Sequence, residues 1–167
     1  MQSKHLSMNN FIKITNLSKK YEKNKAIKVL KDLSFNFVSG KSYSIMGPSG
    51  SGKSTLLNML SLIDSPTTGS IVINNKKINT NNNVENDIIR ASKIGIIYQD
   101  KNLLSDFTAL ENVYLPNLLI SKEKEKSKEL AEKLIKKVGM ITRLNHFPSE
   151  LSGGENQRIA IARALIN

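Results

Sequence analysis

Two segments near the N-terminus alternate apolar and polar residues. Phe11–Ile14 and Leu33–Phe37 place an apolar side chain at every second position, which is the period of a half-buried strand. A turn at Ser39–Lys41 follows the second segment. Further strand-like segments are Ser42–Met46, Ser70–Ile73 and Ile94–Tyr98, the last of them ending at Gln99. The pattern predicts a small antiparallel sheet that leads into a core of buried strands.

A helix is predicted directly after Gly47–Thr55. Its apolar residues recur at helical spacing from Leu56 to Ile63. Asp64–Gly69 contains Ser, Pro and Gly and is expected to end this helix. Val84–Ala91 has the character of a short helix, and the run Asn81–Asn83 before it is interpreted as exposed loop.

The second half of the chain is helical in character. Thr108–Glu111 fits a capping box that opens a helix, which Pro116 is expected to bend or end. Ser121–Val138 is amphipathic, with Gly139 as its stop, and its lysines and glutamates predict a solvated face with helix-stabilising pairs. The apolar residues of Glu155–Ile166 predict a last, packed helix. Strands early and helices late predict an α/β nucleotide-binding core with a helical insertion.

Composition fits a globular chain of about one domain. The 167 residues include no cysteine, and no apolar run approaches the length that spans a membrane. Twenty-five Lys and Arg against fourteen Asp and Glu give a net charge of +11, which raises the possibility of a nucleic-acid partner. Only four of the cations are arginine, the usual residue for bidentate recognition of bases and phosphates. We therefore expect a lysine-rich, solvated surface and no nucleic-acid partner.

The residues between the predicted strand and helix match the phosphate-binding loop pattern G-x-x-x-x-G-K-[ST]. Glycines let backbone N–H groups turn toward an anion, and the positive end of the following helix points at the same place. The lysine would add charge for the β- and γ-phosphates, and Ser54 is placed to ligate Mg²⁺. The alternative is an ordinary glycine-rich turn. The candidate nucleotide-binding residues of this loop are Gly47, Pro48, Ser49, Gly50, Ser51, Gly52, Lys53, Ser54 and Thr55.

A second candidate anion site lies about a hundred residues later. Its residues are Leu151, Ser152, Gly153, Gly154 and Glu155, at the start of the last predicted helix. A hydroxyl and two glycine amides at a helix N-terminus can hold an anion. Taken alone, the same residues also fit an ordinary capped helix start.

Together, the two motifs resemble those of the nucleotide-binding subunits of ABC transporters. The resemblance implies a P-loop NTPase fold: residues 1–100 would form an antiparallel β subdomain and the P-loop core, and residues 101–167 a helical subdomain, within one partial domain. It implies that the LSGGE residues contact ATP held by a second protomer. Gln99 matches the family glutamine that reaches Mg²⁺ and the attacking water. Tyr21 falls where an aromatic residue stacks on adenine, although a plain surface tyrosine is the alternative.

The segments Ile97–Gln99, Asn102–Val113 and Pro148–Glu150 narrow the resemblance to the ATP-binding subunits of Lol-type lipoprotein-releasing systems. That similarity implies a homodimer beneath two inner-membrane permease subunits, at the cytoplasmic face, with Gln99–Pro116 receiving the permeases. Relatives in macrolide-export and cell-division systems share most of these motifs and remain alternatives.

The carboxylates that the family uses to hydrolyse ATP do not occur in the sequence. The family supplies them from an apolar run ending in Asp-Glu, followed by a switch histidine, downstream of the LSGGE helix; this sequence stops at Asn167. The expectation is a C-terminally truncated chain without a catalytic residue, whose exposed sheet edges make it poorly stable or prone to aggregation. A non-hydrolysing ATP-binding or regulatory fragment is a further alternative.

Overall fold

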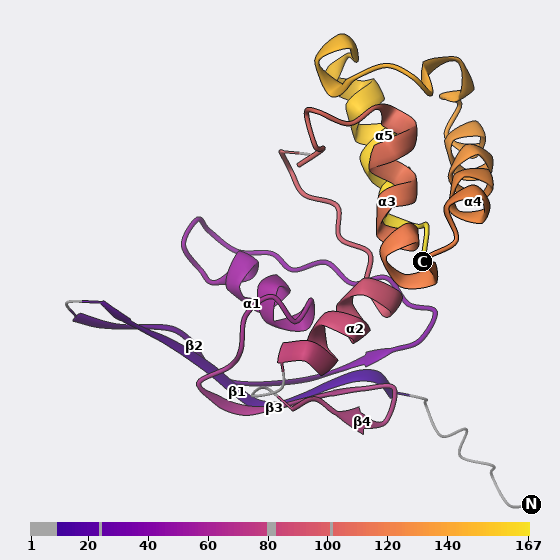
Figure 1. Cartoon of the computed structure of the whole chain (residues 1–167). Coiled ribbons are helices and arrows are strands. Elements are labelled where there is room, and N and C mark those ends of the chain that lie inside the picture. The colour runs from indigo at the N-terminus through magenta and orange to yellow at the C-terminus, as the bar shows by residue number, and fades with distance from the viewer. Residues whose placement is uncertain (1–9, 24, 80–82, 101) are drawn as a thin grey trace, which may run out of the picture. The chain divides into compact units, whose positions relative to one another are not determined.

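The computed structural model describes residues 10–23, 25–79, 83–100 and 102–167 (Figure 1). They form two compact units that divide between Asp87 and Ile88. Of the predicted asparagine-rich loop, Asn81 and Asn82 lie outside the described residues, and Asn83 begins a helix.

The first unit is built on a four-stranded antiparallel sheet with the order β2-β1-β3-β4. Its strands are β1 (Asn10–Lys23), β2 (Lys25–Val38), β3 (Thr68–Ile73) and β4 (Lys76–Lys77). Pairing places Ile14 of β1 opposite Phe35 of β2 and Ile71 of β3. Ile14, Leu17 and Ile71 are buried. The strands predicted from the period-2 pattern at 11–14, 33–37 and 70–73 are therefore confirmed.

Strands β1 and β2 are both longer than the segments predicted from the alternation. The alternation does not run along their whole length, because the middle of the pair is irregular. The register shifts between Ile14 and Leu17, and Asn16 and Asp32 have φ angles of 49° and 46°. The Ser18 hydroxyl accepts a hydrogen bond from the Asp32 N–H at 2.9 Å. A bulge reverses which face a side chain occupies, so simple alternation is lost along this stretch.

Helix α1 (Lys53–Leu60) follows the phosphate-binding loop, as predicted. Leu56 and Met59 are its buried residues. The helix ends earlier than Ile63, because Leu62 adopts a positive φ of 59°. Asp64–Gly69 then leads into β3, as the turn residues predicted.

The second unit is a helical bundle. Helix α2 (Asn83–Lys93) crosses the division between the units, and α3 (Ala109–Ser121), α4 (Lys124–Lys137) and α5 (Gly153–Ala164) pack side by side (Figure 1). Short 3-10 turns, η1 (Ile141–Arg143) and η2 (Pro148–Glu150), link α4 to α5. Val113, Ile135 and Ile159, one from each bundle helix, are fully buried in a common core.

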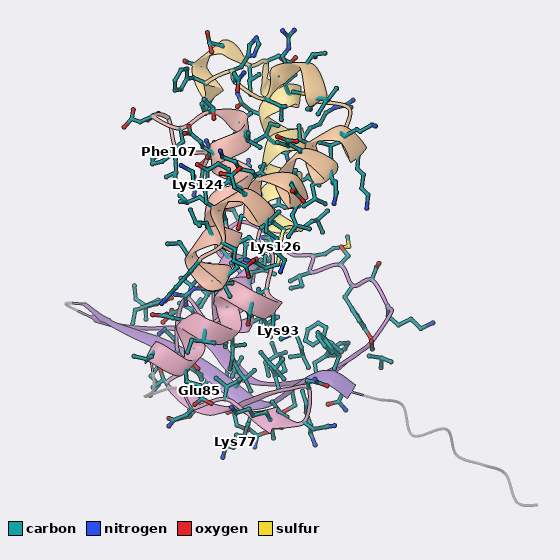
Figure 2. The ribbon with its side chains drawn as sticks, turned by 45° about the vertical axis from the view of Figure 1, so that its right-hand side comes forward. Lys77, Glu85, Lys93, Phe107, Lys124 and Lys126 are labelled. Atoms are coloured by element: carbon teal, nitrogen blue, oxygen red, sulfur yellow. The ribbon has the colours of Figure 1, made fainter. Side chains whose placement is uncertain are left out.

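The lysine-rich start of α4 is solvated, as predicted. Lys124 and Lys126 are exposed on this helix, and Figure 2 labels both. Lys126 pairs with Glu123 at 3.6 Å and Lys128 with Glu125 at 3.4 Å. Exposed pairs of this kind contribute little energy, so the charge run is explained by solubility and helix formation.

The ends of the helices follow their predicted caps, with one exception. The Thr108 hydroxyl accepts from the Glu111 N–H, and the Glu111 carboxylate accepts from the Thr108 N–H, which is the predicted capping box. Gly139, with φ at 74°, stops α4. Pro116 was expected to bend or end α3; it does not end the helix, which continues to Ser121. Residues on both sides of Pro116, such as Val113 and Leu118, pack on the core, and their burial offsets the lost backbone hydrogen bond.

Two predicted strands were wrong. Ser42–Met46 and Ile94–Tyr98 have no regular structure, and Met46 and Ile97 are 86% and 47% exposed. Apolar residues favour a strand, but a strand also needs a neighbour to pair its backbone. Within the described ranges neither segment is paired in a sheet. The apolar residues of the two segments were visible in the sequence, but the sequence pattern held no information about a pairing partner.

The buried side chain of Asn112 in α3 holds the loop that precedes this helix. Asn112 Oδ1 accepts from the Leu104 N–H at 2.7 Å, and Asn112 Nδ2 donates to the carbonyls of Leu104 and Phe107 at 3.0 and 2.9 Å. Asn112 is 1% exposed. The Asn112 side chain thus supplies hydrogen-bond partners for backbone groups of Leu104 and Phe107 in this loop.

We predict that Asn112→Ala destabilises the chain by about 2–4 kcal/mol, because it leaves several buried loop groups without partners. Urea unfolding monitored by circular dichroism measures the change. Asn145→Ala, at an exposed position, is the control and should change stability by less than about 0.5 kcal/mol. Equal losses in the two variants would show that the Asn112 hydrogen bonds contribute nothing specific.

Candidate functional site

The phosphate-binding loop has the backbone shape that its glycines predict. Gly50 and Gly52 have φ angles of 79° and 89°, a region that side chains rarely adopt. Gly52 is the N-cap of α1, and no side chain caps the helix there. The first N–H groups of α1 therefore remain available to an anion, together with the positive end of the helix dipole.

A pocket of about 230 Å³ lies at this helix start. Val29 of β2 contributes to its wall, and the loop supplies the polar lining. The lining residues from the loop and α1 are Ser49, Gly50, Gly52, Lys53, Ser54 and Thr55. Small side chains, hydroxyls and one ammonium group form a surface that suits phosphate oxygens. Ser54 is exposed here, where its hydroxyl could reach a phosphate-bound Mg²⁺.

The side chain of Lys53 folds back over the loop. Lys53 Nζ donates to the carbonyls of Gly47 and Pro48 at 2.9 and 2.7 Å. These bonds hold the ammonium group beside the loop rather than out in solvent. The positive charge of Lys53 is thus held against the backbone of the loop.

Tyr21 lies close to Thr55, at the end of the same loop. Its hydroxyl donates to Asp64 Oδ2 at 2.6 Å. This bond, followed by burial, raises the pKa of Tyr21 above its usual value, and a hydrogen bond with Thr55 partly opposes the rise. Tyr21 is 39% exposed, so part of its surface is open to a ligand.

Asp64 is ionised at neutral pH. Burial alone would raise the pKa of this carboxyl group, but hydrogen bonds from Lys19, Tyr21 and the Ser65 N–H outweigh burial and lower the pKa. Lys19 Nζ lies 2.5 Å from Asp64 Oδ1. Sequence reasoning treated Asp64 only as a helix stop and did not single out Lys19; no motif in the sequence links the two.

The LSGGE residues open α5 in the second unit. The Ser152 hydroxyl accepts from the Glu155 N–H at 3.3 Å, and Glu155 Oε2 accepts from the Ser152 N–H at 2.8 Å. Gly153 and Gly154 are exposed, whereas Leu151 is buried in the bundle core. Leu151 thus anchors in the bundle core the turn that exposes Ser152 and the two glycines.

Arg143 and Asn156 support this helix start. Arg143 Nε donates to Glu155 Oε1 at 3.1 Å. Asn156 Nδ2 donates to the carbonyls of Pro148 and Leu151 at 2.9 and 3.1 Å and so fixes the turn before Ser152. Both roles were missed in the sequence, because neither residue belongs to the five-residue motif.

Gln99 is exposed in a turn of the second unit. The segment Gln99–Pro116 then presents two exposed apolar side chains, Leu104 and Phe107, at 44% and 38% exposure. Figure 2 labels Phe107 on the loop that leads into α3. Lys101 of this segment lies outside the described residues. Gln99 and the LSGGE residues thus belong to the second unit, and Tyr21 and the phosphate-binding loop to the first.

Comparison with known proteins identifies the family. Residues 30–167 match the family described as ABC transporter. The chain belongs to the ABC transporter family. It matches the ATP-binding cassette of these transporters, and no helix among the described residues has the length and apolarity needed to cross a membrane.

Two curated relatives of this ABC transporter chain are the lipoprotein-releasing system ATP-binding proteins LolD of Rickettsia bellii and of Wigglesworthia glossinidia brevipalpis. The first is 44% identical over 160 residues, covering 95% of this chain and 70% of the relative. The second is 46% identical over 163 residues, covering 96% and 71%. The chain therefore spans about 70% of the length of the relatives it matches.

A solved structure gives the same family. The dimeric structure of MJ0796, a bacterial ABC transporter cassette, matches with a TM-score of 0.83 and 44% identity, over 93% of this chain and 69% of that one. A second structure of MJ0796 is a dimeric post-hydrolysis state bound to ADP and Pi. The predicted fold class, an ABC ATPase with an antiparallel β subdomain and a helical subdomain, is confirmed.

We predict that Gly52→Ala destabilises the ABC cassette more than Gly50→Ala does. Both positions have positive φ, so both variants are strained. A Cβ at Gly52 would also lie 2.9 Å from Leu30 Cδ2 and 3.1 Å from the Val29 carbonyl oxygen, whereas a Cβ at Gly50 meets nothing within 4 Å. Chemical denaturation should show an extra loss of about 1–3 kcal/mol for Gly52→Ala. Equal losses of stability in the two variants would mean that Val29 and Leu30 of β2 move away to accommodate the added methyl group.

We predict that Ser152→Ala raises the pKa of Glu155. Hydrogen bonds from the Ser152 N–H, then the Ser152 hydroxyl, then Arg143 lower the pKa of Glu155. A lowered folded pKa means that the cap stabilises the fold above the ordinary glutamate pKa, and that this stabilisation is lost as pH falls through the folded pKa. Carboxyl ¹³C NMR titration should show the rise. Ser149→Ala, at an exposed position before the motif, should leave the Glu155 pKa unchanged.

Proposed function

We propose that this chain is the ATP-binding subunit of a lipoprotein-releasing ABC transporter. The observation that carries the proposal is the phosphate-binding loop, with its uncapped α1 N-terminus beside Lys53, in a chain 44–46% identical to LolD proteins. Its finer parts, the substrate and the membrane partners, are supported by the similarity to those relatives.

In the proposed nucleotide site, one set of residues would hold the phosphates and Mg²⁺, and Tyr21 would contact the base. The N–H groups of α1 and the Lys53 ammonium group would hold the β- and γ-phosphates, and Mg²⁺ would be held by the Ser54 hydroxyl and Gln99. Tyr21 would stack on adenine. The phosphate oxygens are stronger acceptors than the Gly47 and Pro48 carbonyls, so Lys53 would exchange those two contacts for the anion.

A second copy of the chain would complete each site. In this arrangement Ser152, Gly153 and Gly154 of one protomer would face the γ-phosphate held by the other. The support is the exposed, capped start of α5 and the dimeric state of the relative MJ0796. Closing of the dimer on ATP would shift the conformational equilibrium of attached membrane subunits.

The membrane partners would be two inner-membrane permease subunits that bind Gln99–Pro116 from the cytoplasmic face. The exposed Leu104 and Phe107 side chains on a loop fixed by Asn112 support this assignment. Exposed apolar residues on an ordered loop are typical of interaction surfaces. Residues 1–100 and 101–167 would serve as the nucleotide-binding and helical parts of one partial domain.

We predict that Lys53→Ala weakens Mg-ATP binding by the full chain at least tenfold, because it removes a charge-assisted contact to the phosphates. Isothermal titration calorimetry measures the affinity. Lys41→Ala removes an exposed lysine outside the loop and should leave the affinity unchanged.

Equal affinity in Lys53→Ala and the parent chain would contradict the proposed site. Steady ATP turnover that depends on Lys53 would exclude the alternative of a non-hydrolysing fragment. Capture of permeases from macrolide-export or cell-division systems, with no binding to lipoprotein-releasing permeases, would favour those alternatives instead.

A further inference from the structure

Three side chains of the first unit form a connected charged cluster beside the phosphate-binding loop. Lys19 and Tyr21 are two residues apart on β1, and Asp64 lies in the turn after α1. Asp64 Oδ1 accepts from Lys19 Nζ at 2.5 Å and from the Ser65 N–H at 2.7 Å, and Oδ2 accepts from the Tyr21 hydroxyl at 2.6 Å. Both oxygens of the carboxylate are therefore engaged.

Lys19 contacts the tyrosine in a second way. Its Nζ lies 4.8 Å from the centre of the Tyr21 ring, within the range of a cation–π interaction. It also donates to the Ser65 carbonyl at 2.7 Å, and its side chain is only 12% exposed. A long side chain with three partners has little freedom, so the ammonium group is a fixed part of the ring's surroundings.

The ring of Tyr21 is thus held at two points. Asp64 fixes its hydroxyl end, and Lys19 lies over the ring. A fixed ring loses no further rotational freedom when a flat ligand stacks on it. The Lys19 cation also partly neutralises the negative potential of the ring face. This potential otherwise opposes face-to-face stacking with another π-system.

The cluster is close to the phosphate pocket. Thr55 lines that pocket, and its side chain lies near enough to Tyr21 to lower the pKa of the Tyr21 hydroxyl. A nucleotide with its phosphates at the start of α1 would therefore have Tyr21 within reach of its base.

We propose that Lys19 and Asp64 are positioning residues that fix the Tyr21 ring as the platform for the nucleotide base. This inference rests on the proposed function, because the phosphates must bind at α1 for the base to reach Tyr21. It goes further by assigning a role to two residues outside every sequence motif. Their effect would be confined to the base and would not extend to the phosphates.

The test compares two ligands, Mg-ATP and inorganic tripolyphosphate with Mg²⁺, by calorimetry on the full chain. Asp64→Asn and Lys19→Met should each weaken ATP binding about fivefold to tenfold, because stacking on an unrestrained ring is less favourable. Tripolyphosphate has no base, so its affinity should change by less than about twofold. Lys19→Arg keeps a cation over the ring and should restore most of the ATP affinity.

Two further variants keep the test decisive. Tyr21→Phe removes only the hydroxyl that Asp64 holds and should reproduce the Asp64→Asn effect, even if the charge variants unfold. Lys20→Met removes the neighbouring exposed lysine of β1 and should change neither affinity. Thermal unfolding of each variant confirms that the fold is intact.

The outcomes separate the two proposals. Failure of the parent chain to bind either ligand would overturn the proposed function. Binding of both by the parent, with Asp64→Asn and Tyr21→Phe weakening both ligands equally or neither, would overturn the positioning role and leave the phosphate site in place.

Discussion

The packing of helix α1 on the sheet determines where the phosphate-binding loop lies. Leu56 and Met59 are buried on one side of this helix, and Leu56 lines the same apolar cavity as Ile14 of β1. At the start of the helix, Gly52 approaches Val29 and Leu30 so closely that a methyl group would not fit without movement. The backbone N–H groups of α1 are therefore aimed by apolar contacts several residues away. Without this packing, the glycines would give the loop freedom but no fixed direction.

Much of the fold follows from local sequence signals. The alternation at residues 11–14 and 70–73, the capping box at Thr108 and the stop at Gly139 each act within a few residues, and the structure has them where they were predicted. Ser42–Met46 and Ile94–Tyr98 carried an equally clear apolar pattern but formed no strands. Strand formation depends on a partner that is distant in sequence, and a single segment holds no information about that partner.

The same distinction applies to the site. The loop from Gly47 to Thr55 could be predicted because the lysine, the glycines and the helix start are neighbours in sequence. Asp64 could not, because its relation to Tyr21 depends on how a turn after α1 lies against β1, 43 residues away along the chain. The register shifts in β1 also interrupt the period-2 alternation, so the sequence does not indicate on which face of the sheet Tyr21 lies. Contacts built from two distant segments become visible only once the chain is folded.

The two helix starts proposed as anion sites differ in the groups that an incoming anion would meet. Helix α5 begins with Ser152, whose hydroxyl already accepts a hydrogen bond from the Glu155 N–H, and its first turn carries the negative charge of Glu155. At α1 the lysine rests on two neutral carbonyls. An ion that displaces them must offer the ammonium group better acceptors than a peptide carbonyl, and chloride does so poorly whereas a polyphosphate does so well. At the proposed site, the resting position of Lys53 would therefore favour anions of high basicity and charge density over weakly basic ones.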